Sequence, residues 1–437
     1  NYENYEKLTK NIPNFRDVIL DSVDFFCTGS PASIPSNAQY TTRKNGKKIE
    51  TTIEEEIKND YETRNCGWVP KNKNTESILL IGGTASGKTT LLQSAIIQLK
   101  RSAPYLGMHL QTCSPLSNLL LEYFEQRFMD SKWGGATENG CRTSIQIVLQ
   151  KSNDPSVKYY FVINDIAGEN FEEMIRKGKM SNEIESPLEK AKNILFLYDL
   201  VAWRHLYAAL KNPSSENGSW SDVVAEKERQ AQCGRAIADS YTLLLGLIDK
   251  IRNRSESEII DGDKDKIEKT FILAIPRCDF YTGANMFLET WIKDLESKKY
   301  VVKVDETTYT SSWNFSKENE GDKFSSALKR INEISEISSK AIKSLASSQE
   351  KEQETKVLAE QIAENIESTL TTLSKNFKEI KVLPVSALGR KPEKNEDPEK
   401  EFNCKPDPLF SEALLLLPMI NMYNEEKGKF EKTIINS

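Results

Sequence analysis

A glycine-rich stretch after a short apolar run is the first group of residues that could do chemistry. The apolar run is Ile78–Ile81, and the residues after it fit the pattern GxxxxGK(S/T) without a mismatch. Glycines in this pattern allow successive N–H groups to turn toward a phosphate, while the lysine suits β- and γ-phosphates and the threonine hydroxyl suits Mg²⁺. The pattern predicts a loop that binds a nucleoside triphosphate. Its predicted nucleotide contacts are Gly82, Gly83, Thr84, Ala85, Ser86, Gly87, Lys88, Thr89 and Thr90, with Lys88 also serving catalysis and Thr89 the metal.

A second group of residues lies at the end of an apolar stretch, 157–164, that we expect to be a strand. Asp165 follows it directly, and Gly168 completes the pattern DxxG. An aspartate at this place suits coordination of Mg²⁺ through water, and the glycine N–H suits a γ-phosphate that later leaves. Glu169 comes next, and its carboxylate can accept a proton from water but brings negative charge near a phosphate. We interpret Glu169 as a water-positioning group that depends on a partner's cation or gives way to another catalytic group.

Two further segments are suited to recognition of a base. Asp279 follows the expected strand 271–275, and its carboxylate can accept two hydrogen bonds from the N1–H and the 2-amino group of guanine. Adenine offers no such pair of donors. Arg277 can lay its aliphatic stem over the purine ring. The expected strand 382–385 is followed by backbone N–H groups that suit guanine O6, those of Ser386, Ala387 and Leu388.

These four pieces, in this order, resemble the translation-factor and Ras-like class of P-loop GTPases over roughly residues 77–298 and 381–426. The resemblance implies Mg²⁺-dependent binding of GTP and GDP, and hydrolysis of GTP to GDP and phosphate. The class usually has an (N/T)KxD motif, whereas this chain has Pro276-Arg277-Cys278-Asp279. Pro276 lacks the side chain that normally ties this loop to the phosphate loop.

The resemblance also implies a threonine that meets the metal and the γ-phosphate. Thr143 is the first candidate, because it lies 22 residues upstream of Asp165, a separation familiar from small GTPases. Thr137 is the second candidate, and the alternative is that Thr143 is an ordinary strand residue. Arg142 is the one arginine whose position suggests an internal arginine finger.

At finer grain, three short segments resemble the bacterial double-GTPase group. They are the sequences DIAGE at 165–169, RCDF at 277–280 and KPDPL at 405–409. Proteins of this group sit in conflict and phage-defence operons, often beside a second GTPase. The resemblance therefore implies an antiviral role and a protein partner.

Strands that alternate with helices predict an α/β fold of the P-loop NTPase type, three layers with a mostly parallel sheet. We expect an N-terminal extension (1–76), a GTPase core (77–298 and 381–426), a helical insertion (299–380) and a C-terminal tail (427–437). Apolar residues recur at helical spacing in the insertion, at Leu328, Ile331, Ile334, Ile342 and Leu345, and again from Leu358 to Phe377. One hypothesis is that this stripe docks a partner, such as a second GTPase, and is dispensable for folding. The alternative is that it packs on the core.

Composition bears on nucleic-acid binding, membrane insertion and cellular location. The chain of 437 residues has a net charge of −6, so no global basic field recruits nucleic acid. The longest apolar run near the end, residues 413–420, is too short to span a bilayer, and no signal-peptide pattern opens the chain. Seven cysteines without CxxC spacing favour reduced thiols and a cytoplasmic protein.

Two other functions remain open at this stage. An ATP-driven P-loop machine normally has a second acid beside the Walker aspartate, whereas Asn164 and Ile166 flank Asp165. A pseudo-GTPase scaffold would bind nucleotide without turnover. Intact Lys88 and Thr89 argue against it, while Glu169 leaves room for it.

Overall fold

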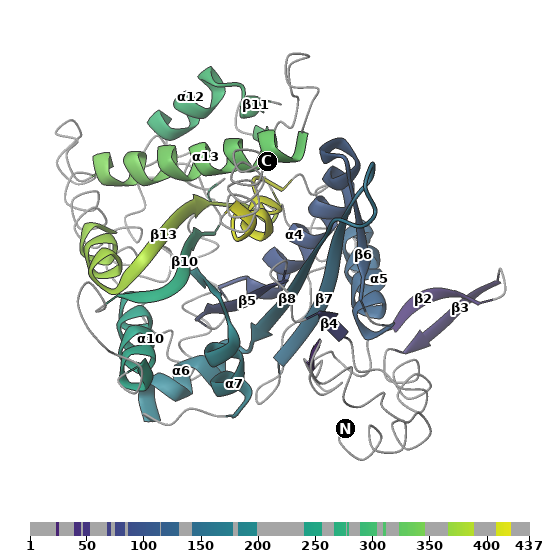
Figure 1. Cartoon of the computed structure of the whole chain (residues 1–437), viewed down its shortest axis with the longest axis horizontal. Coiled ribbons are helices and arrows are strands. Elements are labelled where there is room, and N and C mark those ends of the chain that lie inside the picture. Colours follow the sequence, from purple (N-terminus) through teal and green to yellow (C-terminus); the bar gives the residue numbers. More distant parts are fainter. Residues whose placement is uncertain are drawn as a thin grey trace, which may run out of the picture.

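The computed structural model of the chain is shown in Figure 1. It describes residues 23–25, 39–44, 47–52, 68–70, 75–83, 86–113, 115–130, 142–177, 182–198, 240–255, 266–276, 278, 289–303, 309–311, 323–345, 366–388 and 408–420.

The described residues build one large sheet of seven strands in the order β13-β10-β9-β5-β8-β7-β6. Every neighbouring pair from β13 to β8 is parallel, and β7 runs antiparallel to both β8 and β6. The mostly parallel α/β sheet expected of a P-loop NTPase is therefore confirmed. The strands are β5 (Thr75–Gly82), β6 (Met108–Thr112), β7 (Arg142–Lys151), β8 (Lys158–Ile166), β9 (Asn193–Leu197), β10 (Ile267–Ile275) and β13 (Phe377–Pro384).

The sequence analysis did not predict β6, and it placed the start of β13 too late. β6 is an edge strand with alternating burial, and its five residues are too few for a clear periodic signal. Phe377, which continues a helical apolar spacing in the sequence, instead opens β13 and packs against Phe271 of β10 with ring centroids 4.7 Å apart. Burial of this pair overrides the local helical pattern.

Helices cover both faces of the sheet, as Figure 1 shows. On one side lie α6 (Gly168–Lys177), α7 (Asn182–Lys190) and α10 (Ser240–Ser255). On the other lie α4 (Lys88–Ser102), α5 (Pro115–Met129), α12 (Glu289–Ser297), α13 (Lys323–Leu345) and the short α15 (Ala413–Leu416). Strands buried on both faces read as continuous apolar runs, and Ile78–Ile81 of β5 are at most 3% exposed. The three-layer arrangement is confirmed.

Helix α13 packs its apolar face on the rest of the protein. Phe324 stacks on Tyr159 of β8 with centroids 5.6 Å apart, and Ile331 and Ile334 are fully buried. A polar contact also joins α13 to α12, where the Trp291 indole N–H donates to Ser338 Oγ at 2.8 Å. For Leu328, Ile331 and Ile334 the structure confirms that the stripe packs on the core, so the hypothesis of an exposed apolar docking face is wrong there. The side chains of Ile342 and Leu345 lie outside the described residues. Leu358 and Ile362 lie outside the described residues, and the boundaries 299 and 380 stay predictions.

A second set of contacts holds α13 to the residues after α12. The Tyr300 hydroxyl donates to the Glu333 carboxylate, and the Arg330 guanidinium lies over the Tyr300 ring at 5.0 Å from its centroid. Burial, and then the hydrogen bond to Glu333, raise the pKa of Tyr300 to about 12. The two strands that follow α12, β11 (Val301–Lys303) and β12 (Tyr309–Ser311), form a small antiparallel ladder.

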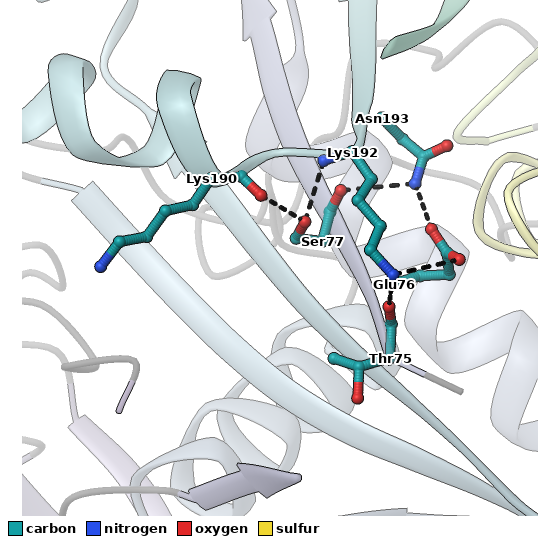
Figure 2. Close-up of polar contacts among 6 residues, drawn as sticks. All are labelled: Thr75, Glu76, Ser77, Lys190, Lys192 and Asn193. Carbon is teal, nitrogen blue, oxygen red and sulfur yellow. Dashed lines mark hydrogen bonds and ion pairs between the residues drawn. The ribbon is translucent and has the colours of Figure 1, made fainter. Parts of the chain in front are cut away.

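The amino end of β5 is fastened to the turn before β9 by a polar cluster, shown in Figure 2. Ser77 Oγ donates to Lys190 O at 2.8 Å and accepts from Lys192 N at 2.9 Å. The buried Glu76 carboxylate accepts a hydrogen bond of 2.6 Å from Asn193 Nδ2. Because a buried carboxylate is stable only with such partners, the cluster fixes the register of the two central strands. It lies at the end of the strands away from the phosphate loop.

Short strands also occur before the large sheet. β1 (Val23–Phe25) pairs with β4 (Trp68–Pro70), and β2 (Gln39–Lys44) pairs with β3 (Lys47–Thr52), each antiparallel. The Asn45-Gly46 dipeptide between β2 and β3 is a strong hairpin signal that the sequence analysis passed over. Among the described residues, no helix is long and apolar enough to cross a membrane.

Candidate functional site

The predicted site residues lie at the carboxyl ends of the strands, where the edge of the sheet collects the loops. β5 ends at Gly82 and α4 begins at Lys88, so residues 82–89, the phosphate loop, join a central strand to a helix N-terminus. Gly87 has φ of 85°, in the left-handed region that favours glycine. At Gly82 a Cβ would come within 3.0 Å of both Leu197 Cβ and Ser86 Oγ, so the close approach of the loop to β9 requires glycine. Thr84 and Ala85 lie outside the described residues.

Lys88 turns back over the phosphate loop. Its Nζ donates to Gly82 O and to Gly83 O, both at 3.0 Å, and the residue is only 7% exposed. Burial lowers the pKa of Lys88, while the carboxylates of Asp165, Glu169 and Glu172 act in the opposite direction. The two carbonyl oxygens hold Lys88 Nζ at the loop, where an incoming phosphate can exchange for them.

Asp165 and Thr89, the two predicted metal ligands with described side chains, are in direct contact. Thr89 Oγ1 donates to Asp165 Oδ2 at 2.8 Å, and Asp165 is fully buried. The parallel register of β5 and β8 sets Asp165 opposite Leu80, two residues before the loop. A hydroxyl and a carboxylate are the hard oxygen donors that Mg²⁺ takes together with phosphate oxygens, so the residues present fit this metal. No cluster of three His, Cys, Asp or Glu side chains occurs in the described residues, so a metal here would rely on nucleotide and water for its other ligands.

A buried hydroxyl of the phosphate loop also fits a bound ligand. Ser86 Oγ is buried without a hydrogen-bond partner among the described residues. A buried hydroxyl without a hydrogen-bond partner destabilises the folded protein, so a ligand oxygen that accepts from Ser86 Oγ would remove this free-energy penalty.

Helix α6 begins at Gly168, the glycine of the DxxG pattern. Gly168 is buried, and Glu169 lies in the first turn, half-buried. Glu172, one turn later on the same face of the helix, also reaches the loop, since its Oε1 lies 3.3 Å from the position of a Cβ on Gly83. The sequence analysis missed Glu172. Its spacing of three from Glu169 was the available signal.

The antiparallel register places the backbone of Thr143 opposite Asp165, and that of Arg142 opposite Ile166. This brings the start of β7 to the same edge of the sheet as the metal ligands. The side chains of Thr143 and Arg142, and all of Thr137, lie outside the described residues. Their roles stay predictions.

The two base-recognition segments are held together by backbone hydrogen bonds. Cys278 N donates to Val385 O at 3.0 Å, and Val385 N donates to Ile275 O at 2.8 Å. Arg277 and Asp279 lie on either side of Cys278 but outside the described residues. The structure therefore brings Cys278 next to the end of β13, and guanine recognition by Arg277 and Asp279 stays a prediction.

Of the three amides predicted for guanine O6, two already have partners. Ser386 N donates to Leu409 O at 3.0 Å, and Leu388 N donates to Ser386 Oγ at 3.3 Å. In the part of the chain that the structure describes, no hydrogen bond from Ala387 N is found, while Ala387 O accepts 2.7 Å from Ser94 Oγ of α4. This contact fixes the peptide next to the helix that starts at the phosphate loop. Ala387 N–H is therefore the donor best placed for a base.

Comparison with known proteins agrees with this geometry. Residues 79–245 match the model of the family Double-GTPase 1. These residues belong to the double-GTPase group of P-loop GTPases. The match runs from β5 through the phosphate loop and Asp165–Glu169 into α10, and it ends before the predicted base-recognition segments. The resemblance drawn from the sequence motifs is confirmed. No curated protein sequence matches the chain.

Proposed function

We propose that the protein is a Mg²⁺-dependent GTPase that binds GTP and hydrolyses it to GDP and phosphate. The contact of Thr89 with Asp165 beside a buried Lys88 carries the proposal, because it assembles the phosphate and metal ligands in one place. The double-GTPase match supports guanine as the base. The resemblance to that group further supports action in the cytoplasm with a second GTPase in a defence system.

The residues divide the work by their chemistry. Lys88 Nζ leaves the two loop carbonyls and binds the β- and γ-phosphates, and the loop N–H groups, including those of Thr90 and the residues before it, bind phosphate oxygens. Thr89, Asp165 and Thr143 would hold Mg²⁺. The metal, when bound, neutralises charge that develops on the phosphate oxygens.

The remaining roles concern water and base. Gly168 offers its N–H to the γ-phosphate, and Glu169 orients the attacking water by accepting its hydrogen bond. Asp279 accepts from the N1–H and the 2-amino group of guanine, Arg277 covers the ring, and the Ala387 amide donates to O6.

The decisive test is base choice by the full-length chain. Calorimetry with GTP, GDP, ATP and ADP in Mg²⁺ should show preference for the guanine nucleotides, and phosphate release should follow only GTP. Asp279→Asn should weaken guanine binding and shift preference toward xanthine nucleotides, whose C2 carbonyl pairs with an amide. Equal affinity for ATP and GTP refutes the proposal and favours an ATP-driven machine. Tight GTP binding without phosphate release favours a pseudo-GTPase scaffold.

The proposed protein partner needs a docking surface on this chain. The apolar face of α13 is buried in the protein, so a second GTPase would have to dock elsewhere, for example on the polar face of α13 that carries Lys329, Glu336 and Lys340. Reversing these three charges should reduce co-purification of a neighbouring GTPase without unfolding the chain. Unchanged co-purification removes this face from consideration.

A further inference from the structure

Glu172 is a second carboxylate of α6 at the phosphate loop. It lies one helical turn after Glu169, is half-buried, and its Oε1 lies 3.3 Å from the position of a Cβ on Gly83. Leu243 Cδ1 of α10 also lies 3.3 Å from this position. Gly83 is therefore close to both a charged group of α6 and an apolar group of α10.

Glu172 is one of three carboxylates that act electrostatically on Lys88. Lys88 Nζ lies 3.0 Å from Gly83 O, and Asp165, Glu169 and Glu172 all act electrostatically on this one buried ammonium. A phosphate that binds Lys88 competes with these carboxylates for the same positive charge. Because a triphosphate carries more negative charge at the lysine than a diphosphate, the competition is stronger for the triphosphate.

Helix α6 is positioned by a close contact with α10. Gly246 of α10 leaves room for Ile175 of α6, since a Cβ on Gly246 would lie 2.6 Å from Ile175 Cδ1 and 2.7 Å from Ile175 Cγ2. Glu172 and Ile175 are one turn apart, so the contact with α10 also holds Glu172 at the loop. A shift of α6 against α10 would therefore move Glu172 relative to Gly83.

We propose that Glu172 is a specificity-determining residue whose carboxylate, held at Gly83 by the packing of α6 on α10, lowers affinity for a nucleoside triphosphate relative to the diphosphate. The inference rests on the proposed binding of guanine nucleotides. Repulsion between the Glu172 carboxylate and the γ-phosphate would favour movement of α6 when a triphosphate binds.

Glu172→Gln is the direct test, because it removes the charge and keeps the shape. Calorimetry on the full-length chain, at constant Mg²⁺ and low ionic strength, would give Kd for GDP and for the slowly hydrolysed analogue GTPγS. Two unit charges about 10 Å apart at an effective dielectric constant of about 20 change a binding ratio by about tenfold. We expect the GTPγS affinity relative to that of GDP to rise by about this factor.

Glu173→Gln is the matched control. Glu173 is the next residue on α6, but its carboxylate pairs with Lys177 and its side chain is 41% exposed. The control makes the same change in net charge on the same helix, and we expect the affinity ratio to stay at the wild-type value. Glu172→Asp, which retains the charge and withdraws it by one methylene, should give an intermediate ratio and serves if Glu172→Gln does not fold.

Three results would overturn the inference. The affinity ratio could stay unchanged in Glu172→Gln while both nucleotides bind, it could fall because Glu172 helps to hold the metal, or it could rise equally in Glu173→Gln. Each of these leaves the proposed function intact. If the wild-type chain binds neither GDP nor GTPγS, the proposed function and this inference both fail.

Discussion

At the contact between α6 and α10, Gly246→Ala is a substitution that can stabilise or destabilise the protein, depending on whether the added Cβ meets a side chain of α6. Gly246 lies inside α10, where an exposed helix would gain about 1 kcal/mol from replacing glycine with alanine. Here the added Cβ would lie 2.6, 2.7 and 3.2 Å from three carbon atoms of Ile175. The terminal Cδ1 can rotate away, but Cγ2 belongs to a β-branched side chain with few alternative rotamers. The helix α6 must therefore shift.

Overpacking of this kind costs about 1–3 kcal/mol, which exceeds the gain in helix propensity. We expect Gly246→Ala to lower the free energy of unfolding by about 1 kcal/mol. In an Ile175→Ala background the clash is absent, so the same substitution should raise that free energy by about 1 kcal/mol. The coupling between the two positions is then about 2 kcal/mol.

Urea unfolding of the wild type, both single variants and the double variant measures this cycle, with the slope m checked for constancy. Leu245→Ala, at the adjacent position that is 41% exposed, controls for unspecific effects of substitution in α10. A Gly246→Ala variant that is more stable than the wild type would refute the reasoning. So would additivity of the two substitutions, because it would mean that Ile175 does not occupy the space above Gly246.

Four further predictions concern other parts of the molecule. Lys88→Ala should abolish measurable triphosphate binding in calorimetry, since a charge-assisted contact worth on the order of 2–4 kcal/mol is lost, and unchanged affinity would mean that the loop holds another anion. Ser94→Ala should weaken GDP binding several-fold and lower the free energy of unfolding by about 1 kcal/mol, because the half-buried Ala387 carbonyl loses its donor; an unchanged Kd would show that this contact does not position the base loop. Replacing residues 323–378 with a Gly/Ser linker should unfold the core in a circular-dichroism melt, because it removes the buried face of α13, and a cooperative melt with retained GDP binding would contradict this. Finally, since burial raises the pKa of Tyr300 from 10.0 to about 12, its contribution to stability is complete below pH 10 and is lost as the pH rises through 12; Tyr300→Phe should flatten the fall in unfolding free energy across that interval, and an identical pH profile would exclude the contribution.

Local sequence was sufficient for the phosphate loop and for the existence of most core strands. Gly82, Gly87, Lys88 and Thr89 act through backbone conformation and short-range geometry, so their spacing alone predicts the loop. Buried parallel strands such as β5, β9 and β10 are continuous apolar runs, which makes them visible without knowledge of their neighbours. The family resemblance followed from motifs carried on these same elements.

Tertiary structure decided the features that depend on contacts between distant segments. The stripe of α13 has the same pattern whether it docks a partner or packs on the core, and only its contacts with Tyr159 and Trp291 show that it packs. Phe377 continues a helical spacing, but pairing with β10 makes it a strand residue. Glu172 has no motif of its own, and its relation to Gly83 exists because α10 seats α6 at the loop. Periodicity reports which face of an element is apolar, whereas the identity of what covers that face is set by the long-range packing of the whole chain.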